Sequence, residues 1–102
     1  MKVTLQKKGN TGLVWLCGEL DEHTAQSARE QIDNFIKGGK INRLIFDLGK
    51  LSFMDSSGIG VILGRYKLIQ KQGGQVCVKN CTPRVDKIFV MSGLYKIINK
   101  LD

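Results

Sequence analysis

The stretch Phe53-Met54-Asp55-Ser56-Ser57-Gly58-Ile59-Gly60 is the key to the fold, because it joins a strand-like run to a helix-like run. The segment before it, Arg43–Leu48, is apolar over the length of a strand and predicts a central strand. The segment after it carries apolar residues at steps of three and four, which predicts a helix. These residues are Ile59, Ile62, Leu63, Tyr66 and Ile69.

The beginning of the chain predicts a hairpin. Two strand-like segments, Val3–Leu5 and Leu13–Cys17, flank the turn signal Asn10-Thr11-Gly12, which favours an antiparallel pair. Because Leu13–Cys17 is almost continuously apolar, we expect its strand to be covered on both faces.

The rest of the chain alternates between helical and strand-like runs. Asp21 or Thr24 can cap a first helix that Gly38-Gly39 ends. The Thr82-Pro83 pair is a strong helix start, with Thr as the cap and Pro at the first helical position. The expected elements are a helix over 25–36, a strand over 75–78, a helix ending at Ser92-Gly93, and a strand or extended segment over 94–98.

This order, β-β-α-β-α-β-α-β, predicts a single α/β domain over residues 1–102, with helices packed on a small, mixed and mostly parallel sheet. A length of 102 residues suffices for one core. No apolar run approaches the ~20 residues of a membrane span, and the first eight residues lack the apolar block of a signal peptide. We therefore expect a cytoplasmic protein without a membrane span.

The net charge of +7 favours an acidic partner. The charge alone fits an acidic protein surface and a nucleic acid equally well. The basic residues are scattered, however, and no cluster has aromatic residues interleaved for base stacking. The expectation is therefore no nucleic acid partner, and a small nucleic-acid-binding protein stays as an alternative.

The sequence offers little material for catalysis, so we predict that the protein is not an enzyme and uses no cofactor. The residues around Ser56 and Ser57 lack the glycine spacing of a nucleophile elbow, and His23 is the only histidine. The Walker and Rossmann glycine patterns are also missing. Three cysteines with one histidine do not make a convincing zinc site, so no metal is expected and the thiols are predicted to be free and buried.

The Asp55-Ser56-Ser57-Gly58 segment remains as the candidate site. One of its polar residues would cap the helix, and a spare hydroxyl would be exposed at the positive end of the helix dipole. A phosphate on that hydroxyl would gain backbone N–H donors and would bring ~1.5 to 2 negative charges to a surface expected to be neutral to basic. The segment therefore predicts a modification switch.

Residues 51–66 resemble the hallmark motif of the STAS domain, in the form found in anti-sigma factor antagonists of the sporulation branch. Gly18-Glu19-Leu20-Asp21 and residues 91–98 resemble the other two signatures of that family, so the likeness covers nearly the whole chain.

The resemblance implies a function and its partners. Family members bind an anti-sigma factor that is also a serine kinase holding ATP or ADP, and this binding releases the sigma factor. The kinase phosphorylates the antagonist, which then dissociates, and a PP2C-type phosphatase restores it. By position the acceptor is Ser56. Ser57 would be a helix cap or an interface neighbour, and Asp55 would orient the loop or the acceptor hydroxyl.

The resemblance also implies a partner-binding surface and leaves alternatives open. Its residues are Glu19, Asp21, His23, Thr24, Asp55, Ser56, Ser57, Gly58 and Ile59. The alternatives are an antagonist of the general-stress branch with another sigma factor, and a STAS binding module that is not phosphorylated. A STAS module of an anion transporter would need a membrane domain.

Overall fold

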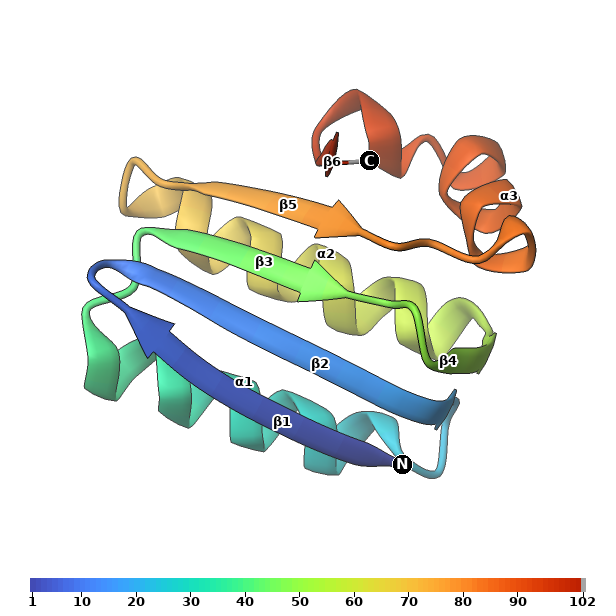
Figure 1. The fold of residues 1–102 in the computed structure, drawn as a ribbon, viewed down its shortest axis with the longest axis horizontal. Helices are drawn as coiled ribbons and strands as arrows, with labels where there is room; N and C mark the ends of the chain where they lie inside the picture. The colour runs from blue at the N-terminus through green and yellow to red at the C-terminus, as the bar shows by residue number, and fades with distance from the viewer. Residues whose placement is uncertain (102) are drawn as a thin grey trace.

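The computed structural model describes residues 1–101, in which six strands form one sheet. The strands lie in the order β1-β2-β3-β5-β6, and the short β4 pairs with β2 off this path (Figure 1). The elements are β1 (Lys2–Lys8), β2 (Thr11–Leu20), α1 (Ala25–Gly39), β3 (Arg43–Asp47), β4 (Leu51–Met54), α2 (Ser56–Lys71), β5 (Gln75–Lys79), α3 (Pro83–Ser92), the 3-10 helix η1 (Leu94–Lys96) and β6 (Asn99–Leu101).

The predicted fold class is confirmed. β1 and β2 form the expected antiparallel hairpin, and the pairings β2–β3, β2–β4, β3–β5 and β5–β6 are parallel. β2, β3 and β5 lie side by side in sequence order, and α1 and α2 lie in the connections between them. Because both crossovers are right-handed, the two helices pack on the same face of the sheet. Figure 1 shows both helices behind the sheet, with the front face open.

The prediction that the second strand is covered on both faces is wrong. Burial alternates along β2: Val14 and Leu16 are fully buried, whereas Trp15 and Cys17 on the other face are only half-buried. A strand that is buried on one face usually alternates between apolar and polar residues. In β2 the apolar residues Trp15 and Cys17 stand at the positions where polar residues are expected, so the sequence does not show which face is exposed.

The strand β4 was not predicted, and it determines how β2 ends. β2 pairs with β3 as far as Trp15, then shifts its register at Gly18 and pairs with β4. Gly18 has φ +106°, a conformation that side chains rarely adopt, and its N–H donates to the Lys50 carbonyl at 3.0 Å. The end of β2 is thereby directed toward β4 instead of β3.

The C-terminal segment differs from the prediction of a strand or extended segment over 94–98. Gly93, with φ +79°, ends α3, and Leu94–Lys96 forms one turn of 3-10 helix before β6 begins at Asn99. Leu94 and Ile98 are buried, which anchors this turn against the core. The apolar residues of this segment do pack inward, but their spacing of four suits a helical turn better than a strand.

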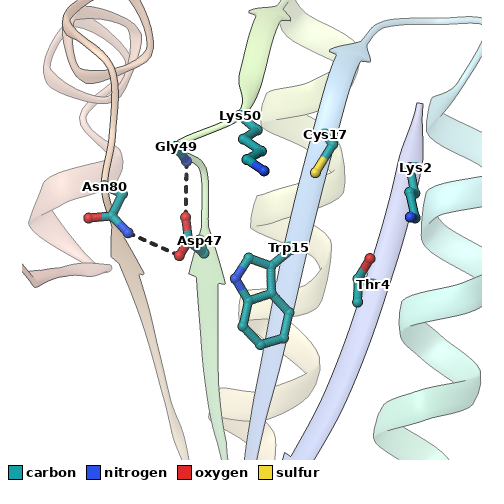
Figure 2. Close-up of a pocket in the computed structure, with 8 residues that line it drawn as sticks. All are labelled: Lys2, Thr4, Trp15, Cys17, Asp47, Gly49, Lys50 and Asn80. Carbon is teal, nitrogen blue, oxygen red and sulfur yellow. Dashed lines mark hydrogen bonds between the residues drawn. The ribbon is translucent and has the colours of Figure 1, made fainter.

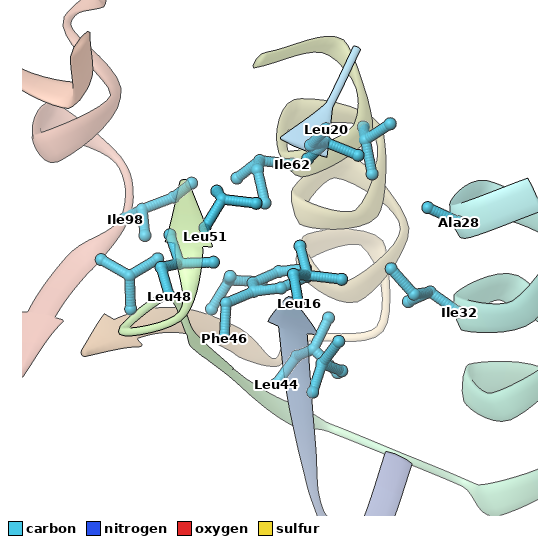
Figure 3. Packing of buried hydrophobic residues seen from close by; sticks show 14 of the residues in the cluster. Leu16, Leu20, Ala28, Ile32, Leu44, Phe46, Leu48, Leu51, Ile62 and Ile98 are labelled. Atoms are coloured by element: carbon cyan, nitrogen blue, oxygen red, sulfur yellow. The ribbon is translucent and has the colours of Figure 1, made fainter. Parts of the chain in front are cut away.

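The core lies between the sheet and the two helices, where β-strand residues such as Leu16 and Phe46 meet Ile32 and Ile62 (Figure 3). The predicted apolar face of α2 is rotated in the structure. Its most buried positions are Gly58, Val61, Ile62, Arg65 and Ile69, while Ile59, Leu63 and Tyr66 are only partly buried.

Candidate functional site

The candidate site lies at the carboxyl ends of β2 and β4. These strands are paired, with Leu20 opposite Met54, and the Asp55 N–H lies 3.4 Å from the Leu20 carbonyl oxygen. The pairing therefore places the loop after β2 next to the first turn of α2. The predicted site residues of both segments lie at one edge of the sheet.

Asp55 is the N-cap of α2. Its backbone is extended, and its Oδ1 accepts hydrogen bonds from the N–H groups of Ser57 at 2.9 Å and Gly58 at 3.4 Å. The Asp55 carbonyl accepts the next bond, from the Ile59 N–H at 3.1 Å. The reading of Ser57 as the cap is therefore wrong: Ser57 is the second helical residue and donates to the cap. Through these bonds Asp55 holds the first turn of α2.

Ser56 is the first residue of α2 and is exposed. Within residues 1–101, its hydroxyl neither donates nor accepts a hydrogen bond, and its backbone N–H has no acceptor. Ser57 beside it is half-buried, as is Ile59. Of the two hydroxyls in the motif, that of Ser56 is thus the more accessible at the positive end of the helix.

The loop before α1 is held by its own hydrogen bonds. Asp21 Oδ1 accepts from the N–H groups of His23 at 2.9 Å and Thr24 at 3.1 Å. The Thr24 hydroxyl donates to the Glu19 carbonyl at 2.8 Å and accepts from the Asp21 N–H at 3.0 Å. Desolvation acts to raise the pKa of Asp21, but the hydrogen bonds from His23 and Thr24 outweigh it and lower that pKa.

This loop presents its charged side chains to solvent. His23 and its neighbour Glu22 are both exposed, and their side chains lie 3.7 Å apart. The sequence predicted Asp21 or Thr24 as the cap of this helix. Thr24 is the N-cap residue but makes no side-chain cap hydrogen bond, and Asp21 instead accepts from the Thr24 N–H.

Gly58 supports the site from beneath. A Cβ at this position would overlap Cγ of Met54 and would lie 3.1 Å from both Cγ and the carbonyl oxygen of Leu20. The first turn of α2 can therefore approach the β2–β4 pair closely only because residue 58 has no side chain. Leu20 and Met54 are positioning residues that no local pattern revealed, because their role depends on the unpredicted strand β4.

The two segments that the β2–β4 pairing brings together at Ser56 carry several carboxylates. Asp55 is next to Ser56, and the adjacent loop contributes Glu19, Asp21 and Glu22. A net charge of +7 for the whole chain gave no indication of this, because charge totals do not locate charges.

The remaining predictions about composition have mixed outcomes. The three cysteines are free, as expected, but only Cys77 is buried, and Cys17 and Cys81 are half-buried. No three potential metal ligands among His, Cys, Asp and Glu gather anywhere in residues 1–101. None of the helices described in that range is long and apolar enough to span a bilayer.

The Asp47 carboxylate accepts bonds from the Gly49 N–H and Asn80, in keeping with its interpretation as a strand-end residue.

Comparison with known proteins agrees with the motif. The STAS domain profile matches residues 2–102. An anti-sigma F factor antagonist of Paenibacillus polymyxa is 42% identical over 98 residues, covering 96% of this chain and 84% of the relative.

Two solved structures resemble the whole fold. The anti-sigma factor antagonist SpoIIAA in its unphosphorylated form superposes with a TM-score of 0.79 at 30% identity, covering 99% of this chain and 88% of the other. The Bacillus cell fate determinant SpoIIAA in the phosphorylated form gives a TM-score of 0.78 at 32% identity, with 99% and 92% covered. This chain belongs to the STAS domain family, on the branch of the anti-sigma factor antagonists.

Proposed function

We propose that this protein is an anti-sigma factor antagonist whose binding is switched by phosphorylation of Ser56. The unphosphorylated form binds an anti-sigma factor that is also a serine kinase, and this releases the sigma factor. Phosphorylation of Ser56 ends the binding, and a PP2C-type phosphatase reverses it. The likeness to sigma-F antagonists supports the sporulation branch and a cytoplasmic location.

The observation that carries this proposal is the state of the Ser56 hydroxyl. It is exposed and has no hydrogen bond within the described residues 1–101, because Asp55 already caps the helix. A kinase can therefore reach the hydroxyl without breaking a bond that the fold needs. The neighbouring solved structure of a phosphorylated SpoIIAA supports modification in this family.

The helix terminus tolerates the added phosphate. The free Ser56 N–H and the helix dipole favour a negative group there, while the Asp55 carboxylate opposes it. These contributions have opposite sign and Ser56 takes no part in the cap, so phosphorylation should leave the fold intact. A phosphate adds ~1.5 to 2 negative charges at pH 7, and its effect falls on whatever faces Ser56.

The partner surface consists of the two segments at this edge, which are residues 19–24 and 55–59. In the complex, Ser56 would face the nucleotide of the kinase, whose phosphates are also negative. Phosphoserine would repel them at close range, where screening by salt is weak. We expect basic side chains on the partner opposite the carboxylates of this surface, which are Glu19, Asp21, Glu22 and Asp55.

The test is equilibrium binding to the purified anti-sigma kinase of the same organism with ADP. Ser56→Ala should bind about as tightly as the wild type, and Ser56→Asp should bind more weakly by at least about tenfold, the cost of a like-charge contact of ~1.4 kcal/mol. Ser27→Asp, which adds the same charge on the exposed side of α1, is the control and should bind normally.

If Ser56→Asp and Ser27→Asp bind alike, Ser56 is not the switch and the chain is a STAS binding module that phosphorylation does not control. Binding to the kinase of the general-stress system in preference to the sporulation kinase would assign the protein to that branch.

A further inference from the structure

The open face of the sheet carries a cavity that the proposed function does not use. It has a volume of about 500 Å³ and lies over the carboxyl-terminal halves of β2 and β3 (Figure 2). Its principal lining residues are Lys2, Trp15, Cys17, Asp47, Lys50 and Asn80. The volume falls within the ~300–1,000 Å³ range of small-molecule sites.

Trp15 forms the centre of the cavity on a rigid strand. It is paired with Thr4 of β1 on one side and Asp47 of β3 on the other, so its backbone is fixed by both neighbours. The side chain is half-buried, and within residues 1–101 its indole N–H donates to no acceptor. A half-exposed indole with a free donor offers a ring face for stacking and a polar contact.

Two lysines lie in the cavity with Trp15. Figure 2 shows the Lys50 side chain extending from the β3–β4 connection toward Trp15 and Cys17, and Lys2 lies on the far side of Cys17. Neither ammonium group forms an ion pair in the described part of the chain. Within the described residues, the cavity is therefore lined by one indole ring and two ammonium groups without an ion-pair partner.

Asp47 does not neutralise both lysines. Its Oδ1 accepts from the Gly49 N–H at 3.1 Å and its Oδ2 accepts from Asn80 Nδ2 at 3.0 Å (Figure 2). Asn80 itself has φ +59°, and its amide is directed to Asp47. The carboxylate is thus committed to the wall of the cavity, and an excess of positive charge remains.

We propose that this cavity binds a small molecule made of a flat aromatic ring bearing an anionic group, with the ring on Trp15 and the anion between Lys2 and Lys50. The site goes beyond the proposed function, because it lies on the sheet face and not at the edge with Ser56. The two are separated by the strand β4, which runs from the cavity wall at Lys50 to the helix cap at Asp55.

The test uses the single tryptophan of the chain as its own reporter. The indole N–H resonance of Trp15 is followed by NMR while the folded protein is titrated separately with four probes: 2-naphthoate, 2-naphthyl phosphate, 2-naphthol and inorganic phosphate. A saturable shift with both charged naphthalene probes, and a weaker or absent response to 2-naphthol and inorganic phosphate, is expected. The tighter of the two charged probes identifies a carboxylate or a phosphate as the preferred anion.

Matched variants test the geometry. Lys50→Gln should weaken binding of the charged naphthalene probes about threefold, the effect of one exposed ion pair. Lys37→Gln, which removes an equal charge from the last turn of α1, should leave their binding unchanged. The proposal is overturned if no probe gives a saturable shift, if 2-naphthol binds as tightly as 2-naphthoate, or if the two lysine variants behave alike.

Discussion

The body of α2 and its first turn belong to one helix but follow different rules. In the body, Val61, Ile62 and Ile69 are fully buried and Arg65 lies 2.9 Å from Asp33 of α1. In the first turn, Ser56 is exposed and its hydroxyl is unbonded within residues 1–101. The body of α2 packs in the core, whereas the first turn presents the Ser56 hydroxyl to solvent.

This contrast is consistent with the switch that we propose at Ser56. Gly58 joins the two regions: it is the point where the start of the helix touches the β2–β4 pair closely, and Asp55 caps the helix just before it. Because the cap does not use Ser56, the proposed modification of Ser56 would leave the cap hydrogen bonds in place. Substitutions in each region test this division.

The largest effect is expected in the body. Ile62→Ala should lower the free energy of unfolding by about 2–5 kcal/mol, because Ile62 is fully buried and its removal leaves a cavity. Chemical denaturation measures this loss. Ser56→Ala is the matched comparison and should stay within about 0.5 kcal/mol of the wild type. Equal losses in the two variants would contradict the division between body and first turn.

The second effect concerns the joint between the two regions. Gly58→Ala should destabilise by about 1–3 kcal/mol, since the new Cβ would overlap Met54 and press on Leu20. Gly60→Ala is the control within the same helix, because a Cβ at that position would meet no atom within 4 Å; it should stabilise by up to about 1 kcal/mol. Thermal unfolding of the two variants in parallel decides, and a stable Gly58→Ala variant would refute the close approach.

The sequence predicted most of the strands and helices, but it did not predict strand β4 or the open face of the sheet. The segment Arg43–Leu48 and the spacing of Ile62 and Ile69 predicted the central strand and the helix, because burial imposes a period on them. Strand β4 could not be predicted: Leu51–Met54 is too short to show a period, and its strand character comes from pairing with β2. The open face was missed because Trp15 and Cys17 are apolar residues on the side of the sheet that no helix covers.

The cap shows a finer limit. Asp55, Ser56 and Ser57 can each cap a helix, and sequence patterns place helix starts only to within one or two residues. Only the extended backbone of Asp55 and its bonds to the next N–H groups distinguish it. The acidic loop at Asp21 became a neighbour of Ser56 through tertiary pairing, which no local pattern contains.

A third, smaller effect is expected at the cap. Asp55→Ala should cost about 1 kcal/mol, because the N–H groups of Ser57 and Gly58 lose their acceptor. Asp55→Asn keeps an oxygen acceptor and should lose less. The free energies of unfolding of the two variants give the comparison, and an Asp55→Ala variant as stable as the wild type would show that Asp55 is not the cap.

The smallest effect is the pH dependence of the neighbouring loop. Because hydrogen bonds lower the pKa of Asp21 from its ordinary value of 3.8, its contribution to stability is complete above that value. The contribution is lost as the pH falls through the lowered pKa of the folded state. NMR titration of the Asp21 carboxyl should give a midpoint below 3.8, and Asp21→Asn should reduce the loss of stability in that acidic range. A midpoint at or above the ordinary value would contradict the bonding of this loop.

The switch at Ser56 is tested most directly by phosphate mapping, after incubation of the protein with the anti-sigma kinase of its organism and ATP. We predict one added phosphate, located on Ser56, absent from Ser56→Ala and retained in Ser57→Ala. A phosphate on Ser57, or none on a folded protein, would contradict the assignment of Ser56 as the acceptor.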